Sequence, residues 1–295
     1  MTHQSIRPPL PTRRSMVRRL LRLFRFLVFG PKHRRRLIGH ELARVIAKLL
    51  GNHYIGEDYK LWLKDDNFMR QYRALYPHTY FSEERKYALK EFARATRQVE
   101  GDLAECGSYI GVSAWFVANE LPDIDFFLFD SFEGLSTPHC LDSVRDGLPQ
   151  WQRGDFQTHE EILRFNLRGF PKVHVLKGWI PDRFPEVSER RFRFVHIDVD
   201  LYVPTLESLK FFYPRLNPGG IIVLDDYGFE NCPGAYQAAQ EFMRDKPEVI
   251  IHLPTGQGVI IRHFDADSPS NRMLKDTQSQ RIRAPRNLRA NQKCP

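Results

Sequence analysis

The stretch FVHIDVDLYVPT, residues 194–205, decides the fold class of this chain. It begins with the continuous apolar run of a strand that is buried on both faces, and it then shows two carboxylates, Asp198 and Asp200. The stretch GGIIVLDDYG, residues 219–228, repeats the pattern with Asp225 and Asp226. Acids at the carboxyl ends of two buried strands indicate a parallel sheet with a polar site along one edge.

Short apolar runs alternate with helical segments around these two stretches. The strands are expected at residues 101–107, 126–130, 172–178, 192–200, 220–226, 248–253 and 258–264. The helices that link them are expected at 111–121, 160–167, 203–216 and 235–245. This alternation predicts an α/β fold with a mostly parallel, Rossmann-like, seven-stranded sheet and helices on both faces. The last two strands are joined by PTGQG and are expected to form a hairpin.

Charge is distributed unevenly along the 295 residues. Residues 1–50 carry 13 Lys and Arg and one acid, Glu41, and residues 281–295 carry five basic residues and no acid. The remaining residues, 51–280, have a net charge of −9. We expect a basic arm (1–50), a helical lid segment (51–98) with a helix that starts at Ser82, an α/β domain (99–265) and a loose basic tail (266–295).

The basic arm contains MVRRLLRLFRFLVFG, residues 16–30, which has the pattern of a cationic amphipathic helix. Its basic face holds Arg18, Arg22 and Arg25 with Arg19 beside them, and its apolar face holds Leu20, Leu23, Phe24 and Leu27. Three interpretations remain open. The helix lies on an anionic membrane surface, it packs on the body or on a neighbouring subunit of a homo-oligomer, or it is a transit peptide.

Cysteine usage and hydropathy bear on the compartment. The four cysteines show no metal-binding spacing and are too few for a disulfide scaffold, which favours a reducing compartment. No apolar run reaches the ~18 residues that a membrane span needs. We therefore expect a cytoplasmic protein, with peripheral attachment to a membrane surface as the role open to the arm.

The first two strands of the α/β domain end in residues that suit a nucleoside. Gly107 and Gly111 fit a turn that lets a ligand approach the backbone, although their spacing is not that of a pyrophosphate loop, and Glu105 before the turn would attract a cationic group. Asp130 follows Gly107 by 23 residues and is placed to accept hydrogen bonds from ribose hydroxyls. S-adenosylmethionine fits these features, and Trp179 is either an adenine-stacking residue or a core aromatic.

The two acidic pairs predict a metal site. Residues two apart on a strand share a face, so Asp198 and Asp200 are expected to point the same way, beside Asp225 and Asp226 of the adjacent strand. Four carboxylates at one edge repel one another unless a cation neutralises them. Oxygen ligands favour Mg²⁺, with Mn²⁺ or Ca²⁺ as alternatives. Solvated acids that cap the next helices would explain one pair better than both.

Several motifs together resemble one known family. GDLAECGSYIGVSAWF, LFDSFEGL, LKGWIPDRFPE, HIDVDLYVPTLESL and LNPGGIIVLDDYGFENCPGA are similar, in order and spacing, to the macrocin O-methyltransferase (TylF-type) family over residues 78–264. The resemblance implies a class I methyltransferase fold and Mg²⁺-dependent methylation of sugar hydroxyls.

The resemblance also implies roles for individual residues. Asp198, Asp225 and Asp226 would be metal ligands, Asp200 would be the general base, and Tyr80 would belong to a lid. The expected contacts to S-adenosylmethionine are Tyr80, Glu105, Gly107, Tyr109, Gly111, Ser113, Asp130, Ser131, Phe132, Gly134 and Trp179.

The chain also departs from the family pattern. It reads GSYIGV where members often read GVWRGG, its arm has no counterpart in the short antibiotic enzymes, and residues 136–156 follow only the outline. The resemblance therefore indicates the type of reaction more closely than it indicates the substrate. The expected function is Mg²⁺-dependent O-methylation of a sugar or another small-molecule or glycoconjugate acceptor, with no specific nucleic-acid partner. The alternatives are a glycosyltransferase that uses the D-x-D pair, and a non-catalytic membrane-surface adaptor.

Overall fold

The computed structural model describes residues 32–51, 55–56, 60–75, 82–143 and 151–263. The chain divides into two compact units, one through Met69 and one from Arg70. The first unit contains helix α2 (Lys32–Leu49), the short 3₁₀ helix η1 (Leu61–Lys64) and the start of helix α3 (Asp66–Leu75). Within the described part of the chain, every helix is too short or too polar to cross a membrane. The arginines of residues 16–30 and the tail from residue 266 lie outside the described residues.

The second unit is built on one seven-stranded sheet with the order β3-β2-β1-β4-β5-β7-β6. Its strands are β1 (Asp102–Cys106), β2 (Phe126–Asp130), β3 (Val173–Lys177), β4 (Phe192–Ile197), β5 (Leu216–Leu224), β6 (Ile251–His252) and β7 (Gly258–Ile261). Strands β1 to β5 are parallel, whereas β7 runs antiparallel to both β5 and β6. The predicted fold class and the terminal hairpin are therefore confirmed.

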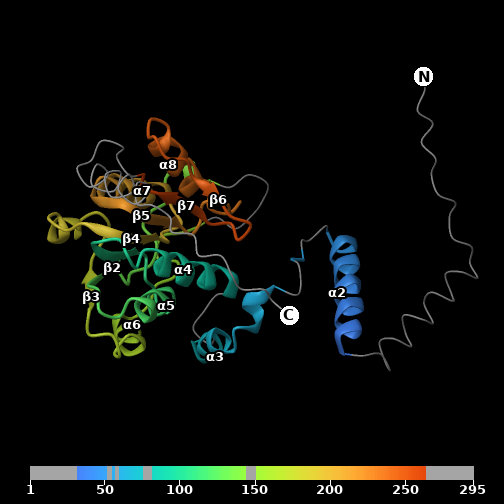
Figure 1. Cartoon of the computed structure of the whole chain (residues 1–295). Coiled ribbons are helices and arrows are strands. Elements are labelled where there is room, and N and C mark those ends of the chain that lie inside the picture. The colour runs from blue at the N-terminus through green and yellow to red at the C-terminus, as the bar shows by residue number, and fades with distance from the viewer. Residues whose placement is uncertain (1–31, 52–54, 57–59, 76–81, 144–150, 264–295) are drawn as a thin grey trace, which may run out of the picture. The chain divides into compact units, whose positions relative to one another are not determined.

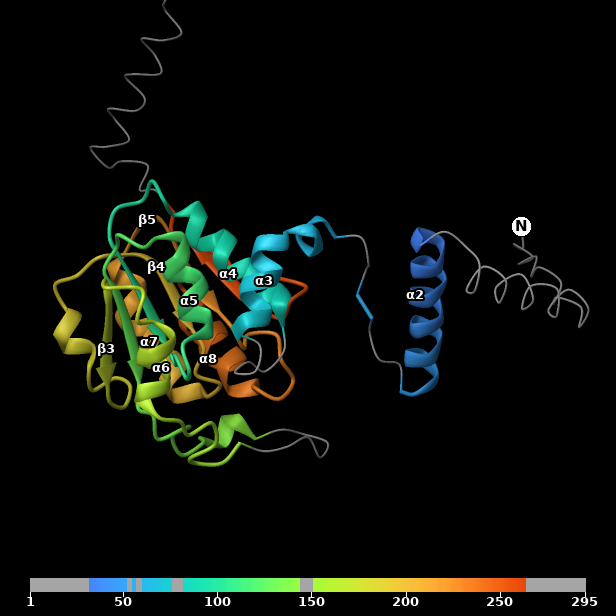
Figure 2. The same cartoon turned by 90° about the horizontal axis from the view of Figure 1, so that it is seen from below.

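Helices cover both faces of this sheet (Figure 1). They are α4 (Glu83–Ala95), α5 (Val112–Glu120), α6 (Glu160–Asn166), α7 (Tyr202–Phe212) and α8 (Pro233–Met243). One core packs α7 and α8 against the sheet through side chains such as Phe212 and Ala239. The other packs α4, α5 and α6 through Leu89, Val117 and Leu163, and Figure 2 shows the same layers from below. Because both faces are covered, the strands are mostly apolar, as the sequence indicated, with Glu105 and His196 as buried exceptions.

The strand order reverses between β1 and β4. From β1 the chain moves outward to β2 and β3, and it then returns to β4 and moves outward in the other direction through β5. In open parallel sheets, ligands bind beyond the carboxyl ends of the strands at such a switch point. This topology places the loops after β1, β2, β4 and β5 around one region.

Two local expectations need correction. Strand β4 ends at Ile197, so Asp198 and Asp200 lie in the loop after it, and the argument from shared strand faces does not apply to them. Asp200 has a left-handed backbone, with φ of 56°. Ser82 does precede α4, but its side chain makes no capping hydrogen bond to the helix backbone. Its Oγ instead accepts a hydrogen bond from Nε of Arg85, at 2.8 Å.

Candidate active site

A cavity of about 640 Å³ lies at the switch point of the sheet. Residues from the loops after β1, β2, β3, β4 and β5 line it, together with the first turn of α4. Among the described residues that line it are five acids, Asp130, Asp198, Asp200, Asp225 and Asp226, and two bases, Arg85 and Lys86. The cavity is therefore rich in carboxylates, and the acids come from three different loops.

The turn after β1 is shaped by a glycine and an acid. Gly107 has φ of 79°, and a Cβ atom there would lie 1.8 Å from the carbonyl oxygen of Asp198, so only glycine lets the two loops approach. The carboxylate of Asp130 accepts hydrogen bonds from the backbone N–H groups of Ser108 (2.8 Å), Tyr109 (2.7 Å) and Phe132 (2.7 Å). Asp130 thus fixes the turns after both β1 and β2.

The four acids after β4 and β5 form two adjoining groups. One group contains Asp198, Asp225 and His196, and the other contains Asp200, Asp226 and Cys232. Within each group, one potential ligand atom of every residue lies within 4.8 Å of the others. The backbone N–H of Asp200 donates to Oδ2 of Asp226 at 3.0 Å, which joins the two loops. The structure thus brings together all four acids that the sequence singled out.

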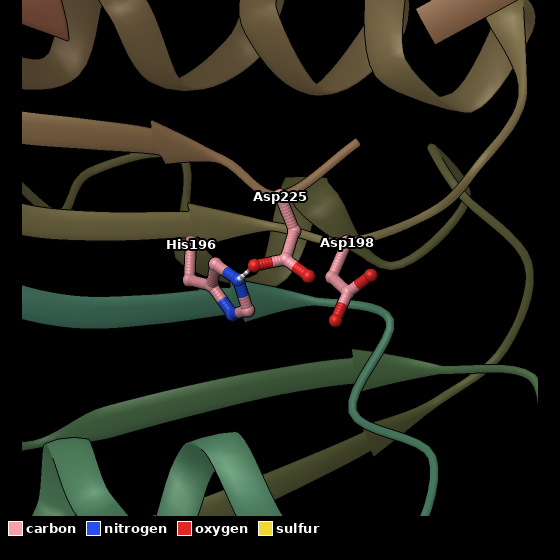
Figure 3. A group of neighbouring side chains, drawn as sticks. All are labelled: His196, Asp198 and Asp225. Atoms are coloured by element: carbon pink, nitrogen blue, oxygen red, sulfur yellow. Dashed lines mark hydrogen bonds and ion pairs between the residues drawn. The ribbon is translucent and has the colours of Figure 1, made fainter. Parts of the chain in front are cut away.

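A buried histidine supports the first group from within the sheet. Nδ1 of His196 lies 2.7 Å from Oε1 of Glu105, its register partner on β1, and Nε2 lies 3.3 Å from Oδ1 of Asp225. Figure 3 shows the imidazole pointing to Asp225, with Asp198 on the side away from His196. Burial alone would lower the pKa of His196, but hydrogen bonds to Asp225 and Glu105 raise it to about 9. The imidazole is therefore a buried cation between two acids.

The second support of Asp225 comes from helix α4. Arg85 forms an ion pair with Oδ2 of Asp225, and Gln257 donates to Oδ1 at 2.8 Å. Burial raises the pKa of Asp225, but Lys86, Arg85 and His196 more than offset burial and hold it well below its ordinary value. The side chain of Asp225 is therefore ionised at neutral pH.

The other three acids are shifted in the opposite direction. Burial and the neighbouring charge of Asp225 raise the pKa of Asp198 to about 6. Burial and Asp198 raise the pKa of Asp200 to about 7, and burial and Asp200 raise that of Asp226 well above its ordinary value. Burial is the largest cause of each shift, and repulsion from the neighbouring carboxylates adds to it. Oxygen donors with a charge excess are the donor set that Mg²⁺ or Mn²⁺ takes, so the residues present fit a divalent cation.

The site also fits a polar ligand in the turn after β1. The hydroxyl of Ser108 lines the cavity and is buried, and it has no hydrogen-bond partner among the described residues. A buried hydroxyl without a partner is costly, and a ligand with a hydrogen-bonding group removes that cost. The Ser108 hydroxyl lies beside the glycine turn at which the sequence predicts binding of S-adenosylmethionine.

Most of the predicted cofactor contacts line the cavity. They are Gly107, Tyr109, Ser113, Asp130, Ser131, Gly134 and Trp179. Trp179 does not belong to either buried core cluster, which speaks against the core-aromatic interpretation. Tyr80 lies outside the described residues.

Three predicted contacts do not line the cavity. Glu105 is fully buried and bonded to His196, so it is not open to a cationic ligand in the way the sequence suggested. Gly111 directly precedes α5 with φ of 82°, and a Cβ atom there would meet Leu167 at 3.1 Å. Phe132 is buried, with Nζ of Lys177 over its ring. These three residues support the turns from the side that faces away from the cavity.

The sequence did not reveal several residues that line the cavity or support its acids from behind. Arg85 and Lys86 were recognised as part of a helix but not as cations that reach the acids, because the α4-to-β5 contact is long-range. The acidic site itself was the available signal, since it requires nearby positive charge. His196 was passed over because its neighbour Glu105 comes from a distant part of the chain. Trp151 and Phe156 also line the cavity, with ring centroids 5.1 Å apart.

The fold and the site together define a class I methyltransferase. Among solved structures, the O-methyltransferase NovP covers 63% of this chain and 83% of its own, with a TM-score of 0.54 and 24% identity. The calicheamicin methyltransferase CalS11 covers 71% of this chain and 99% of its own, with a TM-score of 0.53 and 17% identity. At these identities the likeness establishes the fold.

Residues 55–252 match the model of the macrocin-O-methyltransferase (TylF) family, and the chain belongs to that family. It is thus an S-adenosylmethionine-dependent O-methyltransferase. A tetracenomycin-type 4'-O-methyltransferase of Streptomyces olivaceus, which acts on a rhamnosyl derivative, is 29% identical over 188 residues, 58% of this chain and 69% of that protein. The mycinamicin III 3''-O-methyltransferase of Micromonospora griseorubida is 29% identical over 148 residues, 45% of this chain and 58% of that protein.

Proposed function

We propose that the enzyme is Mg²⁺-dependent and methylates a hydroxyl group of a sugar within a glycoside or glycoconjugate. The observation that carries the proposal is the gathering of Asp198, Asp200, Asp225 and Asp226 at one cavity, where the acids outnumber the bases. Acids placed this way are costly without a cation. The relative from Streptomyces olivaceus is named for a rhamnosyl derivative of a larger natural product, which supports a sugar acceptor.

The chain's own residues divide the work between holding and proton transfer. Asp198, Asp225 and Asp226 would hold the divalent cation, which when bound would lower the pKa of the acceptor hydroxyl. Asp200 would accept the hydroxyl proton on its carboxylate. With the cation beside it, Asp200 would be ionised and therefore able to take that proton as a general base.

The donor would lie along the turns after β1 and β2. S-adenosylmethionine supplies a methyl group on a sulfonium. The backbone turn that Asp130 holds, the free hydroxyl of Ser108 and the ring of Trp179 would orient it. Both oxygens of Asp130 already accept backbone hydrogen bonds, two at Oδ2 and one at Oδ1, so its main effect would be to shape the turn, and only Oδ1 keeps a lone pair that could accept from ribose.

The acceptor would bind beside Trp151 and Phe156, which line the same cavity as the four acids. Aromatic rings offer flat apolar surfaces on which the C–H faces of a sugar can pack. These rings belong to the part of the chain that departs from the family pattern. The identity of the acceptor would therefore be set here.

Family membership leaves the other two readings without support. A glycosyltransferase would use the D-x-D pair to hold a nucleotide diphosphate, and a non-catalytic adaptor would have no use for the acids. Both would leave S-adenosylmethionine unused. We retain the membrane surface and a homo-oligomer as roles for residues 1–50, because that arm has a net charge of +12.

A labelled-donor screen tests the proposal. The protein would be incubated with methyl-labelled S-adenosylmethionine and Mg²⁺ against separate glycolipid, polysaccharide and small phenolic fractions. We expect label in a sugar-containing fraction, at a hydroxyl oxygen, and none with an Asp200→Asn protein. Label only in the phenolic fraction would reject the sugar acceptor while leaving the O-methyltransferase assignment in place.

A further inference from the structure

Arg85 is fixed in the acidic site by three contacts. Its side chain is only 18% exposed and forms the ion pair with Oδ2 of Asp225. Its Nε donates to Oγ of Ser82 at 2.8 Å, and its guanidinium lies 4.9 Å from the ring centroid of Phe229. A long, flexible side chain held on three sides has a defined position. That position is at the carboxylates, where a bound cation would also be.

The partners of Asp225 differ in whether a ligand can reach them. His196 and Gln257 both contact Oδ1, and both are fully buried. Among the described residues, Arg85 alone contacts Oδ2, and Arg85 lines the cavity. A cation that enters the cavity therefore meets Arg85 at Asp225, and it does not meet His196 or Gln257. Arg85 is the contact that such a cation can replace.

We propose that Arg85 is a resident counter-ion of the metal-free enzyme, and that a divalent cation displaces it from Oδ2 of Asp225. This inference rests on the proposed function, since it takes Asp225 to be a metal ligand. Without metal, Arg85 reduces the repulsion among the acids. With metal, two cations at one carboxylate oxygen would repel each other, so the guanidinium moves off while Ser82 and Phe229 keep it near the site.

The exchange makes metal binding and the Arg85–Asp225 pair mutually exclusive. Metal binding and formation of the Arg85–Asp225 pair therefore weaken each other by the same factor. Loss of Arg85 should therefore tighten metal binding, although it removes a contact seen in the structure. If Arg85 were instead a permanent part of the metal-bound site, its loss would weaken metal binding or leave it unchanged.

Loss of a nearby positive charge would also tighten metal binding through space. Lys86 provides the matched control. It is the next residue on α4, it is nearly buried and lines the same cavity, and its charge also stabilises Asp225. A Lys86→Gln protein loses one charge without vacating Oδ2. The difference between the two variants isolates the exchange from the effect of charge.

The test is a calorimetric titration of the full-length protein with Mn²⁺, for the unsubstituted protein, Arg85→Gln and Lys86→Gln. We expect Arg85→Gln to lower the Kd for Mn²⁺ by roughly 5- to 150-fold, the usual range for linked sites, and by more than Lys86→Gln does. We also expect Arg85→Gln to lower the Tm without metal, and the difference in Tm to shrink with saturating Mn²⁺. If Arg85→Gln does not fold, Ser82→Ala, which loosens Arg85 but keeps its charge, should lower the Kd to a smaller extent.

The outcomes separate this inference from the proposed function. An unchanged or raised Kd in Arg85→Gln, a decrease no larger than in Lys86→Gln, or, in the fallback, an unchanged Kd in Ser82→Ala would overturn the exchange while leaving the metal requirement in place. If Arg85→Gln bound Mn²⁺ and the other proteins did not, the exchange would be strongly supported. Absence of Mn²⁺ binding in all the proteins would overturn the exchange together with the metal part of the proposed function.

Discussion

The backbone N–H of Asp200 donates a hydrogen bond to the carboxylate of Asp226, with an N–O distance of 3.0 Å. This bond ties the loop after β4 to the loop after β5. Asp200 adopts a left-handed backbone to make it, and its side-chain Oδ1 lies 3.6 Å from the thiol of Cys232. The bond holds the backbone of the proposed base in place while its carboxylate lines the cavity.

This arrangement predicts that binding and catalysis separate in Asp200→Asn. Asparagine tolerates a left-handed backbone, so the loop should keep its shape. The amide cannot accept the proton, and kcat should fall by about 10²- to 10⁴-fold, the usual contribution of a general base. Calorimetry should show nearly unchanged affinity for S-adenosylmethionine. Full turnover by this variant with any acceptor would remove Asp200 from the role of base.

The contact between Gly107 and Asp198 makes a second prediction. A Cβ atom on residue 107 would lie 1.8 Å from the carbonyl oxygen of Asp198, on a backbone that L side chains rarely adopt. Gly107→Ala should therefore push the two loops apart and weaken binding of both S-adenosylmethionine and Mn²⁺, with a left-handed penalty of about 1–2 kcal/mol in the free energy of unfolding before the clash is counted. Thermal unfolding and calorimetry measure these effects.

Gly169→Ala is the matched control, because a Cβ atom there meets nothing within 4 Å. Its Tm and both affinities should stay close to those of the unsubstituted protein. If the two alanine variants had equal Tm values and equal affinities, the close contact between residue 107 and Asp198 would be contradicted.

Glu248 predicts how stability depends on pH away from the active site. It is buried, accepts a hydrogen bond from the hydroxyl of Tyr213 and contacts Arg262. Burial raises its pKa, but the hydrogen bonds from Tyr213 and His263 outweigh burial and lower it below 4.5. A carboxyl with a lowered folded-state pKa stabilises the fold above its unfolded pKa, and this contribution is lost as pH falls through the folded value.

Glu248→Gln should lower the free energy of unfolding at pH 7 by about 1–3 kcal/mol, because charge-assisted bonds are lost. The difference between this variant and the unsubstituted protein should shrink as the pH falls below 4.5, the ordinary value for Glu248. Denaturant unfolding at a series of pH values measures it, and Glu207→Gln, at an exposed helical ion pair, is the control. A difference that stays constant down to acid pH would contradict the pKa shift.

The arm predicts attachment to anionic membranes at low salt. Each basic residue near such a surface contributes on the order of 1 kcal/mol. The full-length protein should pellet with vesicles that contain anionic lipid, and a protein carrying Arg18→Glu, Arg22→Glu and Arg25→Glu should not. If both proteins stay in the supernatant, the membrane interpretation is wrong. A change in oligomer size in the substituted protein would favour the subunit-packing interpretation instead.

The sequence was sufficient for the sheet because its strands are short apolar runs with clear ends. Strand β2 matches its predicted limits, Phe126–Asp130, residue for residue. Strand β5 begins earlier than expected, at Leu216, which pairs with Phe192 of β4 before an irregularity in the register, and regular pairing resumes at Ile221. Strand β6, at one edge of the sheet, has only two residues and is shorter than the expected run at 248–253.

The site was predictable where its residues follow strands and unpredictable where they come from elsewhere. The four acids follow β4 and β5, so topology alone brings them together. Arg85 reaches Asp225 across 140 residues, and no local pattern encodes that contact. The sequence shows only that Glu105 comes just before the glycine turn, and this position alone predicted a contact with the ligand. Its pairing with His196 depends on the register between β1 and β4.

The central claim is that the acid cluster holds a divalent cation that methyl transfer requires. The most direct measurement is the rate of label transfer from S-adenosylmethionine to an accepted sugar substrate, before chelation, after exhaustive chelation and after readdition of Mg²⁺ or Mn²⁺. We expect chelation to abolish transfer, either ion to restore it, and Asp226→Asn to prevent the restoration. Undiminished transfer after exhaustive chelation would contradict the claim and leave the four acids with a structural role.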